Sequence, residues 1–599
     1  MAEDDAEQGR PLGRPVTPPG PGVARPEAEA EAAEPDVAQL DEGSGIARPE
    51  EEPTSELAEA AEARTIEFAA VPAEALAASP YADPTEQLSI PPAPERPSRL
   101  AASVRRALRN PWAPRIALML LVTFSIASKG IDLSQPCKAP CKPQNAHTLI
   151  FDEAYYINAA RVIDHIEPPK SAHYHGAPKG DDPNAEHPQL AKLAIAAGIK
   201  IFGNNPLGWR IGSIVFGVIA LLALYWLVIA AGGSDWLAAG TAAVMSLDNL
   251  MFVHSRIATL DIYAVAMMIV AALLYMRKRP LLAGLALGVA ACMKETALFL
   301  VFVFILLEAL RIARAWMGRD DSDFDRPEGA EGPRIRYGAS HRGGPGPWGG
   351  LGRHGAAAIT VSDGARWRHL PSAPTLADRA RAAAATARQR LPKLGLFLLA
   401  GAAGTLGLLW LLDVLVPAYD PGTHKLYDGN PFSHLAHMYN YAQLLKAKPY
   451  ETGFASPPLD WLFDQKTIKY ASVVVETTVK GKLVGSHATI SFIGEINPFI
   501  IFLAVPGLFA ALAAAWRSGD GVAALGACWC LGTYLPLVIG DLASDRVSYI
   551  YYMLAVMPGV YLVTTRLFAG KRLPPAAAVG WAIMLVYSFV RLYPIHTLL

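Results

Sequence analysis

The chain has 599 residues, of which 52% are hydrophobic and only 18% charged, against about 25% charged residues in a soluble globular protein. Lys and Arg (53) nearly balance Asp and Glu (54), so the formal net charge is −1, and this total gives no reason to expect a nucleic-acid partner. The composition therefore indicates a membrane protein.

Polar sequence is concentrated in two segments. Residues 1–110 are rich in Ala, Glu and Pro and cannot bury enough apolar surface to offset the entropy of ordering, which predicts a disordered cytoplasmic tail. Residues 318–392, rich in Gly, Arg and Ala, are predicted to form a disordered cytoplasmic insert. They separate an N-terminal half, 111–317, from a C-terminal half, 393–599.

Apolar runs of membrane-spanning length fill both halves. A helix needs about 20 apolar residues to cross the hydrocarbon core. These runs are expected to be helical, because in lipid each backbone N–H and C=O must find its hydrogen-bond partner within the protein. We therefore predict an all-α polytopic protein with about eleven spans: 116–133, 211–231, 235–254, 257–276, 280–294, 296–314, 394–416, 497–516, 521–540, 547–566 and 574–592.

The basic residues that flank these runs predict the orientation. With eleven spans they all fall on one side, and because cytoplasmic loops carry the excess of Lys and Arg, we expect the N-terminus inside and the C-terminus outside. Two large loops, 134–208 and 417–495, then face outward. The basic groups are Arg99 to Arg115; Arg277, Lys278 and Arg279; Arg311, Arg314 and Arg319; and Arg566, Lys571 and Arg572.

Ionisable residues collect on the outer side, where a membrane-surface site is expected. Asp152 and Glu153 are adjacent in the first outer loop, and a carboxylate is suited to deprotonate an acceptor hydroxyl. Neighbouring helical positions point about 100° apart, so one of the two is expected to face the reaction. The cations suited to hold a phosphate and stabilise its leaving charge are Arg210, Arg256, Lys192, Lys294 and Arg546.

Several of these residues have a structural alternative. An Asp-Glu pair after a span can be a solvated helix start, an Arg at a span end is usually an interfacial anchor, and Tyr549, Tyr551 and Tyr552 resemble an aromatic belt. We predict no cofactor and no metal site, although loop histidines leave a divalent metal open. Cys137 and Cys141 can be a disulfide on an oxidising side or two free thiols.

Taken in order, the motifs resemble the protein O-mannosyltransferases, which use dolichyl- or polyprenyl-phosphate-mannose and have the membrane-embedded GT-C fold (family 39). The similarity extends over roughly 112–310 and 394–592. The stretches that carry it are Asp152-Glu153, His187-Pro188-Gln189-Leu190-Ala191-Lys192, Asn205-Pro206 through Trp209-Arg210, Asp248-Asn249, Ser255-Arg256 through Asp261, Ser456-Pro457-Pro458-Leu459-Asp460-Trp461 and Asn497-Pro498.

Departures from the family pattern concern the acceptor more than the reaction. Gln189, Leu459 and Tyr551 replace residues that are usual in the family, and the β-trefoil of eukaryotic members is absent from the loop 417–495, which fits the prokaryotic branch. The resemblance implies that His187, Pro188, Asp261, Ser456, Pro458, Trp461 and Asn497 line the substrate loops.

The function implied is an inverting, single-displacement transfer of mannose to Ser/Thr hydroxyls of exported proteins. Asp152 would be the base, Glu153 would assist or orient it, and Arg210 would contact the phosphate. The expected partners are the polyprenyl-phosphate-sugar donor, an exported acceptor met at the secretion translocon, and the bilayer. The expected location is a prokaryotic plasma membrane, with the site outside.

Two alternatives remain open from the sequence. The first is the same chemistry directed to a lipid or a cell-wall glycan, with a pentose or hexose as the sugar. The second is a transporter of lipid-linked sugars, which would need no base at Asp152. A transporter should place polar groups near the membrane midplane, often on repeated halves, and no such repeat is seen in the sequence.

Overall fold

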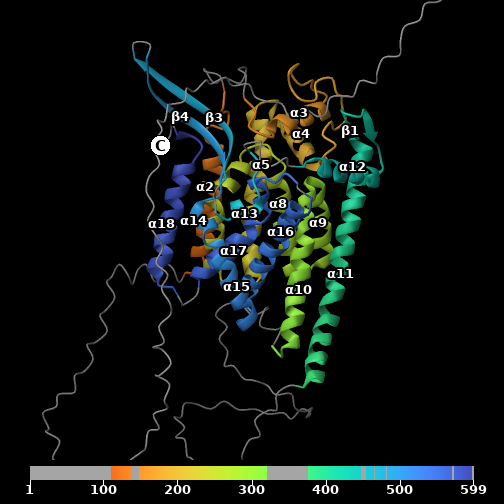
Figure 1. The fold of residues 1–599 in the computed structure, drawn as a ribbon, viewed down its shortest axis with the longest axis vertical. Helices are drawn as coiled ribbons and strands as arrows, with labels where there is room; N and C mark the ends of the chain where they lie inside the picture. The colour runs from red at the N-terminus through yellow and green to blue at the C-terminus, as the bar shows by residue number, and fades with distance from the viewer. Residues whose placement is uncertain are drawn as a thin grey trace, which may run out of the picture. The chain divides into compact units, whose positions relative to one another are not determined.

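The computed structural model describes residues 110–137, 148–319, 375–446, 454–463, 466–479, 482–544, 546–569 and 573–596. These residues belong to one compact unit, Arg105–Leu599. The predicted tail before residue 110, and residues 320–374 of the predicted insert, lie outside the described residues. Helices dominate the described chain (Figure 1), because backbone groups in lipid must be satisfied within their own segment.

The N-terminal half places short helices of the first outer loop between longer apolar ones. Its elements are α2 (Ala113–Gly130), α3 (Glu153–Ile163), α4 (Leu190–Phe202), α5 (Pro206–Ala230), α6 (Asp235–Ser246), α7 (Asn249–His254), α8 (Asp261–Met276), α9 (Pro280–Met293), the 3-10 helix η2 (Glu295–Phe299) and α10 (Leu300–Trp316).

The C-terminal half begins with one long helix and carries two hairpins before its last apolar helices. Its elements are α11 (Leu376–Leu415), β1 (Ala418–Asp420), β2 (Lys425–Tyr427), α12 (Pro431–Leu444), α13 (Pro458–Trp461), β3 (Ile468–Val479), β4 (Lys482–Gly494), α14 (Pro498–Ile501), α15 (Ala504–Ser518), α16 (Gly521–Ser544), the 3-10 helix η4 (Ile550–Ala555), α17 (Met557–Phe568) and α18 (Pro575–Leu592).

Seven helical segments of the described chain are long and apolar enough to cross a membrane: Ala113–Gly130, Pro206–Ala230, Glu295–Trp316, Leu376–Leu415, Pro498–Ser518, Gly521–Ala543 and Pro575–Leu592. The other four predicted spans are shorter or broken; 235–254, for example, divides into α6 and α7. The 14 residues of α9 rise only about 21 Å, less than the ~30 Å hydrocarbon core. The count of eleven and the orientation of the termini stay predictions.

Apolar side chains face outward on several peripheral helices. On α18, Ile583 is 63% exposed and Tyr587 60%, and on α11 Leu399 is 72% exposed. Such apolar faces are costly in water and are the surface that lipid covers. The outer faces of these helices therefore support insertion in a bilayer.

The long helix α11 corrects the predicted boundary of the insert. The 318–392 segment was expected to be disordered, whereas residues from Leu376 onward are helical. Thr375 and Asp378 form a reciprocal capping box, and the Ala-rich run that follows has high helix propensity. The helical part of the C-terminal half therefore starts 17 residues before Lys393.

Glycines allow α9 to pack closely against α11. An added Cβ at Gly288 would lie 2.6 Å from the carbonyl carbon of Gly404, and one at Gly284 would lie 2.5 Å from the Phe397 oxygen. Gly284 and Gly288 are four residues apart and share one helix face. This is the small-residue packing by which helices approach one another in membranes.

The loop 417–495 contains two antiparallel hairpins, β1–β2 and β3–β4, which corrects the all-α expectation. β3 includes three consecutive valines and two threonines, residue types that favour strands. The β3–β4 hairpin projects from the end of the bundle where α3, α4 and α12 also gather (Figure 1). Its base pairs with the C-terminal segment through Ile490 and Ile595.

Candidate active site

Asp152 occupies the N-cap position of α3 but caps no backbone N–H with its side chain. The carboxylate is half-buried and is hydrogen-bonded to no other described residue. Burial raises the pKa of Asp152 to about 7, with Lys294 and His187 acting downward and Asp261 upward. A general base works best when its pKa lies near the operating pH, so this carboxylate has the properties of a base.

The residue before it, Phe151, has a left-handed backbone conformation with φ +53°. Such a conformation is rare for an aromatic residue and persists only where surrounding contacts impose it. The Phe151 ring stacks on Tyr470 with 4.4 Å between centroids. The turn that presents Asp152 is therefore held by packing against β3.

Glu153 is fully buried, and its carboxylate is saturated with hydrogen bonds. It accepts from Nε and Nη2 of Arg210, both at 2.8 Å, and from the backbone N–H groups of Ile150 and Ala258 at 2.8 and 2.9 Å. The two adjacent acids thus differ, because one carboxylate is available and the other is fixed. Glu153 can orient the turn but has no free face for a substrate.

A second charged pair lies beside Asp152. Lys294 Nζ is 2.6 Å from Asp261 Oδ1, and both side chains are more than 90% buried. The Lys294 ammonium also faces the rings of Tyr551 and Tyr552, at 5.3 and 5.9 Å from their centroids. These contacts give a buried cation with aromatic neighbours, next to the available carboxylate.

Aromatic side chains surround this pair. Tyr549, Tyr551 and Tyr552 pack on one another with centroids 5.0 to 5.8 Å apart. Tyr470 of β3 shares a hydrogen bond of 2.9 Å with His254 Nε2. The tyrosines that could have been an interfacial belt therefore gather around Lys294, where ring faces and hydroxyls can contact a sugar.

Lys192 is completely buried and holds the first outer loop through its ammonium group. Its ammonium lies 2.5 Å from Asp182 Oδ2 and donates to the backbone oxygens of Asn184 and His187 at 2.5 and 2.8 Å. His187, in turn, is 3.1 Å from Glu295 Oε2, and Pro188 between the anchored residues is buried. This motif stabilises the loop beside Asp152.

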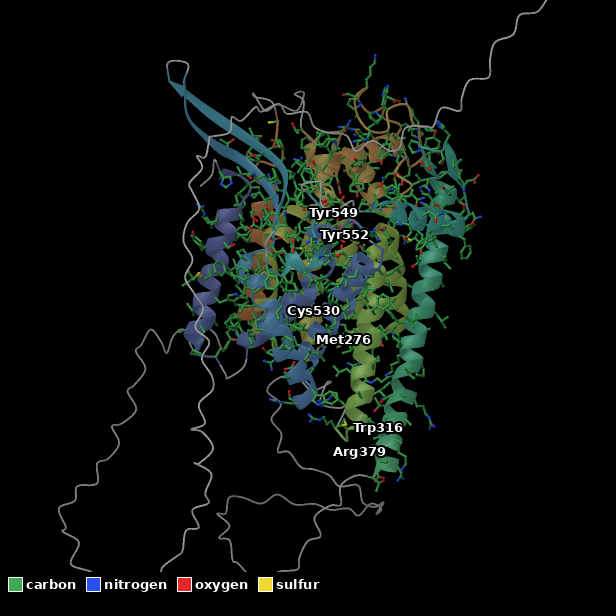
Figure 2. All side chains as sticks on the ribbon, viewed as in Figure 1. Met276, Trp316, Arg379, Cys530, Tyr549 and Tyr552 are labelled. Atoms are coloured by element: carbon green, nitrogen blue, oxygen red, sulfur yellow. The ribbon has the colours of Figure 1, made fainter. Side chains whose placement is uncertain are left out.

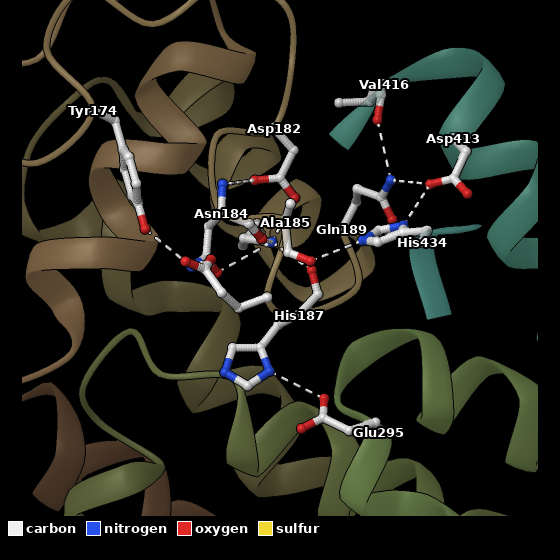
Figure 3. Close-up of polar contacts among 12 residues, drawn as sticks. Tyr174, Asp182, Asn184, Ala185, His187, Gln189, Glu295, Asp413, Val416 and His434 are labelled. Atoms are coloured by element: carbon white, nitrogen blue, oxygen red, sulfur yellow. Dashed lines mark hydrogen bonds and ion pairs between the residues drawn. The ribbon is translucent and has the colours of Figure 1, made fainter. Parts of the chain in front are cut away.

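Gln189 ties the same loop to the C-terminal half (Figure 3). Its Nε2 donates to Asp413 Oδ1 at 2.7 Å, and Asp413 also pairs with His434 Nδ1 at 2.8 Å. His434 Nε2 lies 3.0 Å from the Ala185 oxygen. Gln189, where the family pattern has another residue, thus joins α4, α11 and α12 in one buried network.

Asp248 and Asn497 form a second connection between the halves. Asp248 accepts from the Asn497 N–H at 3.0 Å and from the Tyr561 hydroxyl at 2.7 Å. Asn497 Nδ2 donates to the Leu247 and Leu585 oxygens. Asn497 was predicted to line a substrate loop. In the structure its hydrogen bonds connect the segment before α14 to Leu247, Asp248 and α18.

The stretch Ser456 to Trp461 packs against the tyrosine cluster. Trp461 is fully buried, donates to Ser456 Oγ at 2.8 Å, and meets Tyr552 edge-on at 6.4 Å. Pro458 is anchored by the Tyr534 hydroxyl, which donates to its carbonyl at 2.9 Å. Leu459 instead is 57% exposed. The motif backs the site, and Leu459 is the part that faces outward.

Three of the five candidate phosphate cations are engaged elsewhere. The third guanidinium nitrogen of Arg210, Nη1, donates to the backbone oxygens of Leu133 and Gln135 at 2.6 and 2.7 Å. Arg256 is fully buried and donates to the Ser128 and Asp132 oxygens. Lys192 likewise donates to backbone oxygens of its own loop. All three cations therefore stabilise the backbone around the site.

Arg546 and Lys294 remain as the cations nearest the tyrosine cluster. The charge of Arg546 acts on Tyr549 and Tyr552, and its Nε has no hydrogen-bond partner among the described residues. Asp545 and the side chain of Ser544 lie outside the described residues. Of the five candidates, these two lie beside the tyrosine cluster, and Lys294 is paired there with Asp261.

Comparison with known proteins matches this part of the chain to one family. Residues 151–323 match the model of the dolichyl-phosphate-mannose-protein mannosyltransferases. The polyprenol-phosphate-mannose–protein mannosyltransferase of Mycolicibacterium smegmatis is 32% identical over 123 residues, which is 20% of this chain and 22% of that protein. The Corynebacterium glutamicum protein of the same name is 35% identical over 79 residues, 13% of this chain and 15% of that protein.

Over this segment the chain is similar to the protein O-mannosyltransferases. The S. cerevisiae protein O-mannosyltransferase Pmt1-Pmt2 complex, solved bound to its sugar donor, matches with a TM-score of 0.51 and 11% identity over 80% of this chain and 90% of that one, which shows a shared fold. The matched segments span only 22% and 15% of these two bacterial relatives. The family resemblance inferred from the motifs is thus confirmed.

Two aromatic residues of the site, Tyr156 and Tyr470, were not predicted from the sequence. Tyr156 is buried four residues after Asp152, a spacing that places both on one helix face, so this signal was present. Tyr470 could have been found only by recognising β3. Cys137 is disulfide-bonded, and Cys141 lies outside the described residues.

Proposed function

We propose that this protein transfers mannose from a polyprenyl-phosphate-mannose donor to Ser/Thr hydroxyls of exported proteins, on the outer face of the membrane. The observation that carries the proposal is the different environment of two adjacent carboxylates, Asp152 and Glu153. Asp152 is available and has a pKa of about 7, while Glu153 is immobilised by Arg210. A site that only bound sugar would not need a base of this kind.

The reaction is a single displacement. Asp152 takes the proton of the acceptor hydroxyl as its oxygen attacks the anomeric carbon of mannose. The bond from that carbon to the phosphate oxygen breaks, and polyprenyl phosphate leaves with the bonding electrons. Attack opposite the leaving group inverts the anomeric centre.

The leaving phosphate gains negative charge as this bond breaks. Lys294, and Arg546 beside the tyrosines, are the cations placed to stabilise it, because fixed charges in a water-poor site act more strongly than in solution. Lys294 is already oriented by Asp261 at 2.6 Å. The hydrogen bonds of Lys192, Gln189 and Glu153 fix the positions of the base and the two cations relative to each other. The site is thereby preorganised for the reaction.

The outward placement is supported by two further features. Cys137 in the first outer loop is disulfide-bonded, and disulfides persist in oxidising compartments. The helices long enough to span a membrane carry the site at one end of the bundle, where Tyr549 and Tyr552 lie (Figure 2). We further propose that this membrane is the plasma membrane of a prokaryote.

The test is transfer of radiolabelled mannose from polyprenyl-phosphate-mannose to a Ser/Thr-rich peptide by full-length protein in nanodiscs. Asp152→Asn is compared with Asp164→Asn, a carboxylate at the other end of α3. Loss of a general base should lower kcat about 10²–10⁴-fold, whereas Asp164→Asn should stay within about twofold of wild type.

Other outcomes distinguish the alternatives. Release of free polyprenyl phosphate without labelled peptide, when cell-wall glycan or lipid is supplied, would assign a different acceptor. Movement of the lipid-linked sugar across the bilayer that survives Asp152→Asn would assign a transporter. Equal activity of wild type and Asp152→Asn on the peptide would refute the proposed base.

A further inference from the structure

Helix α12 has a packed side and an exposed side, at the end of the bundle where α3 and α4 also lie (Figure 1). Its packed side is fixed to the protein, because His434 and Met438 are buried and His434 Nδ1 is 2.8 Å from Asp413 Oδ1 of α11. On the other side, Phe432 is 68% exposed and Tyr439 65%. Large apolar side chains thus stand outside the packed core of this helix.

The outward part of α12 divides into an apolar and a polar flank. Successive residues of a helix point about 100° apart, so positions i, i+3, i+4 and i+7 share one flank. The apolar flank consists of Phe432, Leu435, Ala436 and Tyr439, and the polar flank of Ser433, His437 and Asn440. Gln443 and Leu444 in the last turn do not follow this division. The helix contains no Asp, Glu, Lys or Arg, so the two flanks differ in polarity and not in formal charge.

The apolar flank adjoins the exposed apolar surface of α11. Trp410 and Val414, near the end of α11, are each 51% exposed. Gly429, just before α12, lies beside both, since a Cβ added there would be 3.2 Å from Val414 Cγ2 and 3.9 Å from Trp410 Nε1. Phe432 follows three residues later. Trp and Tyr are typical of the level where hydrocarbon meets the headgroups, so both helices present side chains suited to that level.

The far end of α12 is bonded to the segment that leads into the tyrosine cluster. The Val547 N–H donates to the Leu445 oxygen at 2.9 Å, and Lys446 forms an isolated antiparallel bridge with Arg546. Figure 1 shows α12 at the end of α11, lying across the axis of that helix. The helix therefore connects the end of a membrane-spanning segment to the edge of the candidate active site.

We propose that α12 is an interfacial helix whose apolar flank inserts into the headgroup boundary of the leaflet on the active-site side. A helix with one apolar and one polar face lies in the plane of this boundary, with the apolar face toward the acyl chains and the polar face in water. The flank adjoins the exposed apolar surface of α11, so the same leaflet reaches both. Because α12 is bonded to the segment of Arg546, its insertion sets the headgroup level beside that cation. This consequence rests on the proposed function, whereas the insertion itself does not.

The experiment places a nitroxide spin label on full-length protein in phosphatidylcholine nanodiscs and measures its access to oxygen, which concentrates in lipid, and to a water-soluble nickel complex. The test variant Tyr439→Cys is compared with Asn440→Cys, since both positions are exposed but lie on opposite flanks. Leu399→Cys on α11 and Thr423→Cys in the β1–β2 turn, both at exposed positions, supply the references for hydrocarbon and water. The three free cysteines of the described chain are buried, and wild type treated with the label gives the background signal.

We expect the label at position 439 to lie about 5–10 Å inside the headgroup boundary, with access to oxygen that approaches that of the hydrocarbon reference. The label at position 440 should match the water reference, with high access to the nickel complex. The pair Phe432→Cys and Ser433→Cys repeats the comparison near the start of the helix, and it gives an independent reading if Tyr439→Cys does not fold.

Three results would overturn the proposal. High access of the nickel complex to positions 439 and 440 alike would mean that the whole exposed side is in water. A label at position 439 that neither reagent reaches would mean that protein covers the flank, either another segment of this chain or a second copy. High and equal access of oxygen to both positions would place the helix within the hydrocarbon. The depths are measured without donor or acceptor, so a failure of mannose transfer would leave them unchanged.

Discussion

The pH dependence of transfer follows directly from the environment of Asp152. Burial raises the pKa of this carboxyl to about 7, and only the deprotonated form can act as the base. With that pKa, about a tenth of the enzyme is active at pH 6 and about nine tenths at pH 8. The rate constant kcat/KM should therefore rise with pH, with its midpoint near 7.

Two variants of one ion pair should move this midpoint in opposite directions. Asp261 raises the pKa of Asp152 and Lys294 lowers it. Asp261→Asn removes the upward influence, so the midpoint shifts to lower pH; Lys294→Gln removes the downward one, so the midpoint shifts to higher pH. The shift is read from the midpoint, which does not depend on the absolute rate that either variant retains.

Initial rates at subsaturating acceptor, measured from about pH 5 to 9 in nanodiscs, provide the profile. His187 also lowers the pKa of Asp152, so the pH profile of His187→Gln measures its contribution. A rate that stays level down to pH 5 would mean that the base has an ordinary carboxyl pKa. Shifts of the two variants in the same direction would refute the electrostatic reasoning.

Three further changes test the surrounding structure. Glu153→Gln leaves the buried Arg210 without its counter-charge and should destabilise the fold by about 3–5 kcal/mol, seen as a lower Tm that partly recovers in Glu153→Gln/Arg210→Gln; an unchanged Tm would contradict the pairing. Arg546→Gln should raise the donor KM about 10- to 100-fold, the loss of a charged hydrogen bond, and a change in kcat alone would exclude phosphate contact in the ground state. Gly288→Ala, whose new Cβ would lie 2.6 Å from Gly404, should cost about 1–3 kcal/mol, while Gly407→Ala, with open space around it, should cost nothing measurable.

Sequence patterns predicted the residues of the site better than their roles. The apolar runs located the helices because membrane insertion imposes length and composition on each segment. The acidic pair was found, but its division into one free and one bound carboxylate depends on Arg210, 57 residues away. No local pattern reports which of two adjacent side chains meets such a distant partner.

The cations show the same limit. Five were suited to phosphate by charge and by their side of the membrane, yet Lys192 is occupied by Asp182 and Arg256 by backbone oxygens. Only tertiary contacts reveal which cation already has partners within the protein. The β3–β4 hairpin was missed for another reason, because its Val- and Thr-rich run lies in a loop that was interpreted only through its motifs.

The connections between the two halves also bear on how the protein is made. Gln189 bonds Asp413 across 224 residues, and Asp248 bonds Asn497 across 249. At a synthesis rate of ~5–20 residues per second, the second partner of each pair is added to the chain roughly 10–50 s after the first. During that interval Lys192 can already hold Asp182, but the base and the cations near Tyr551 are not yet assembled. The newly inserted N-terminal half should therefore be catalytically silent until the last third of the chain has entered the membrane.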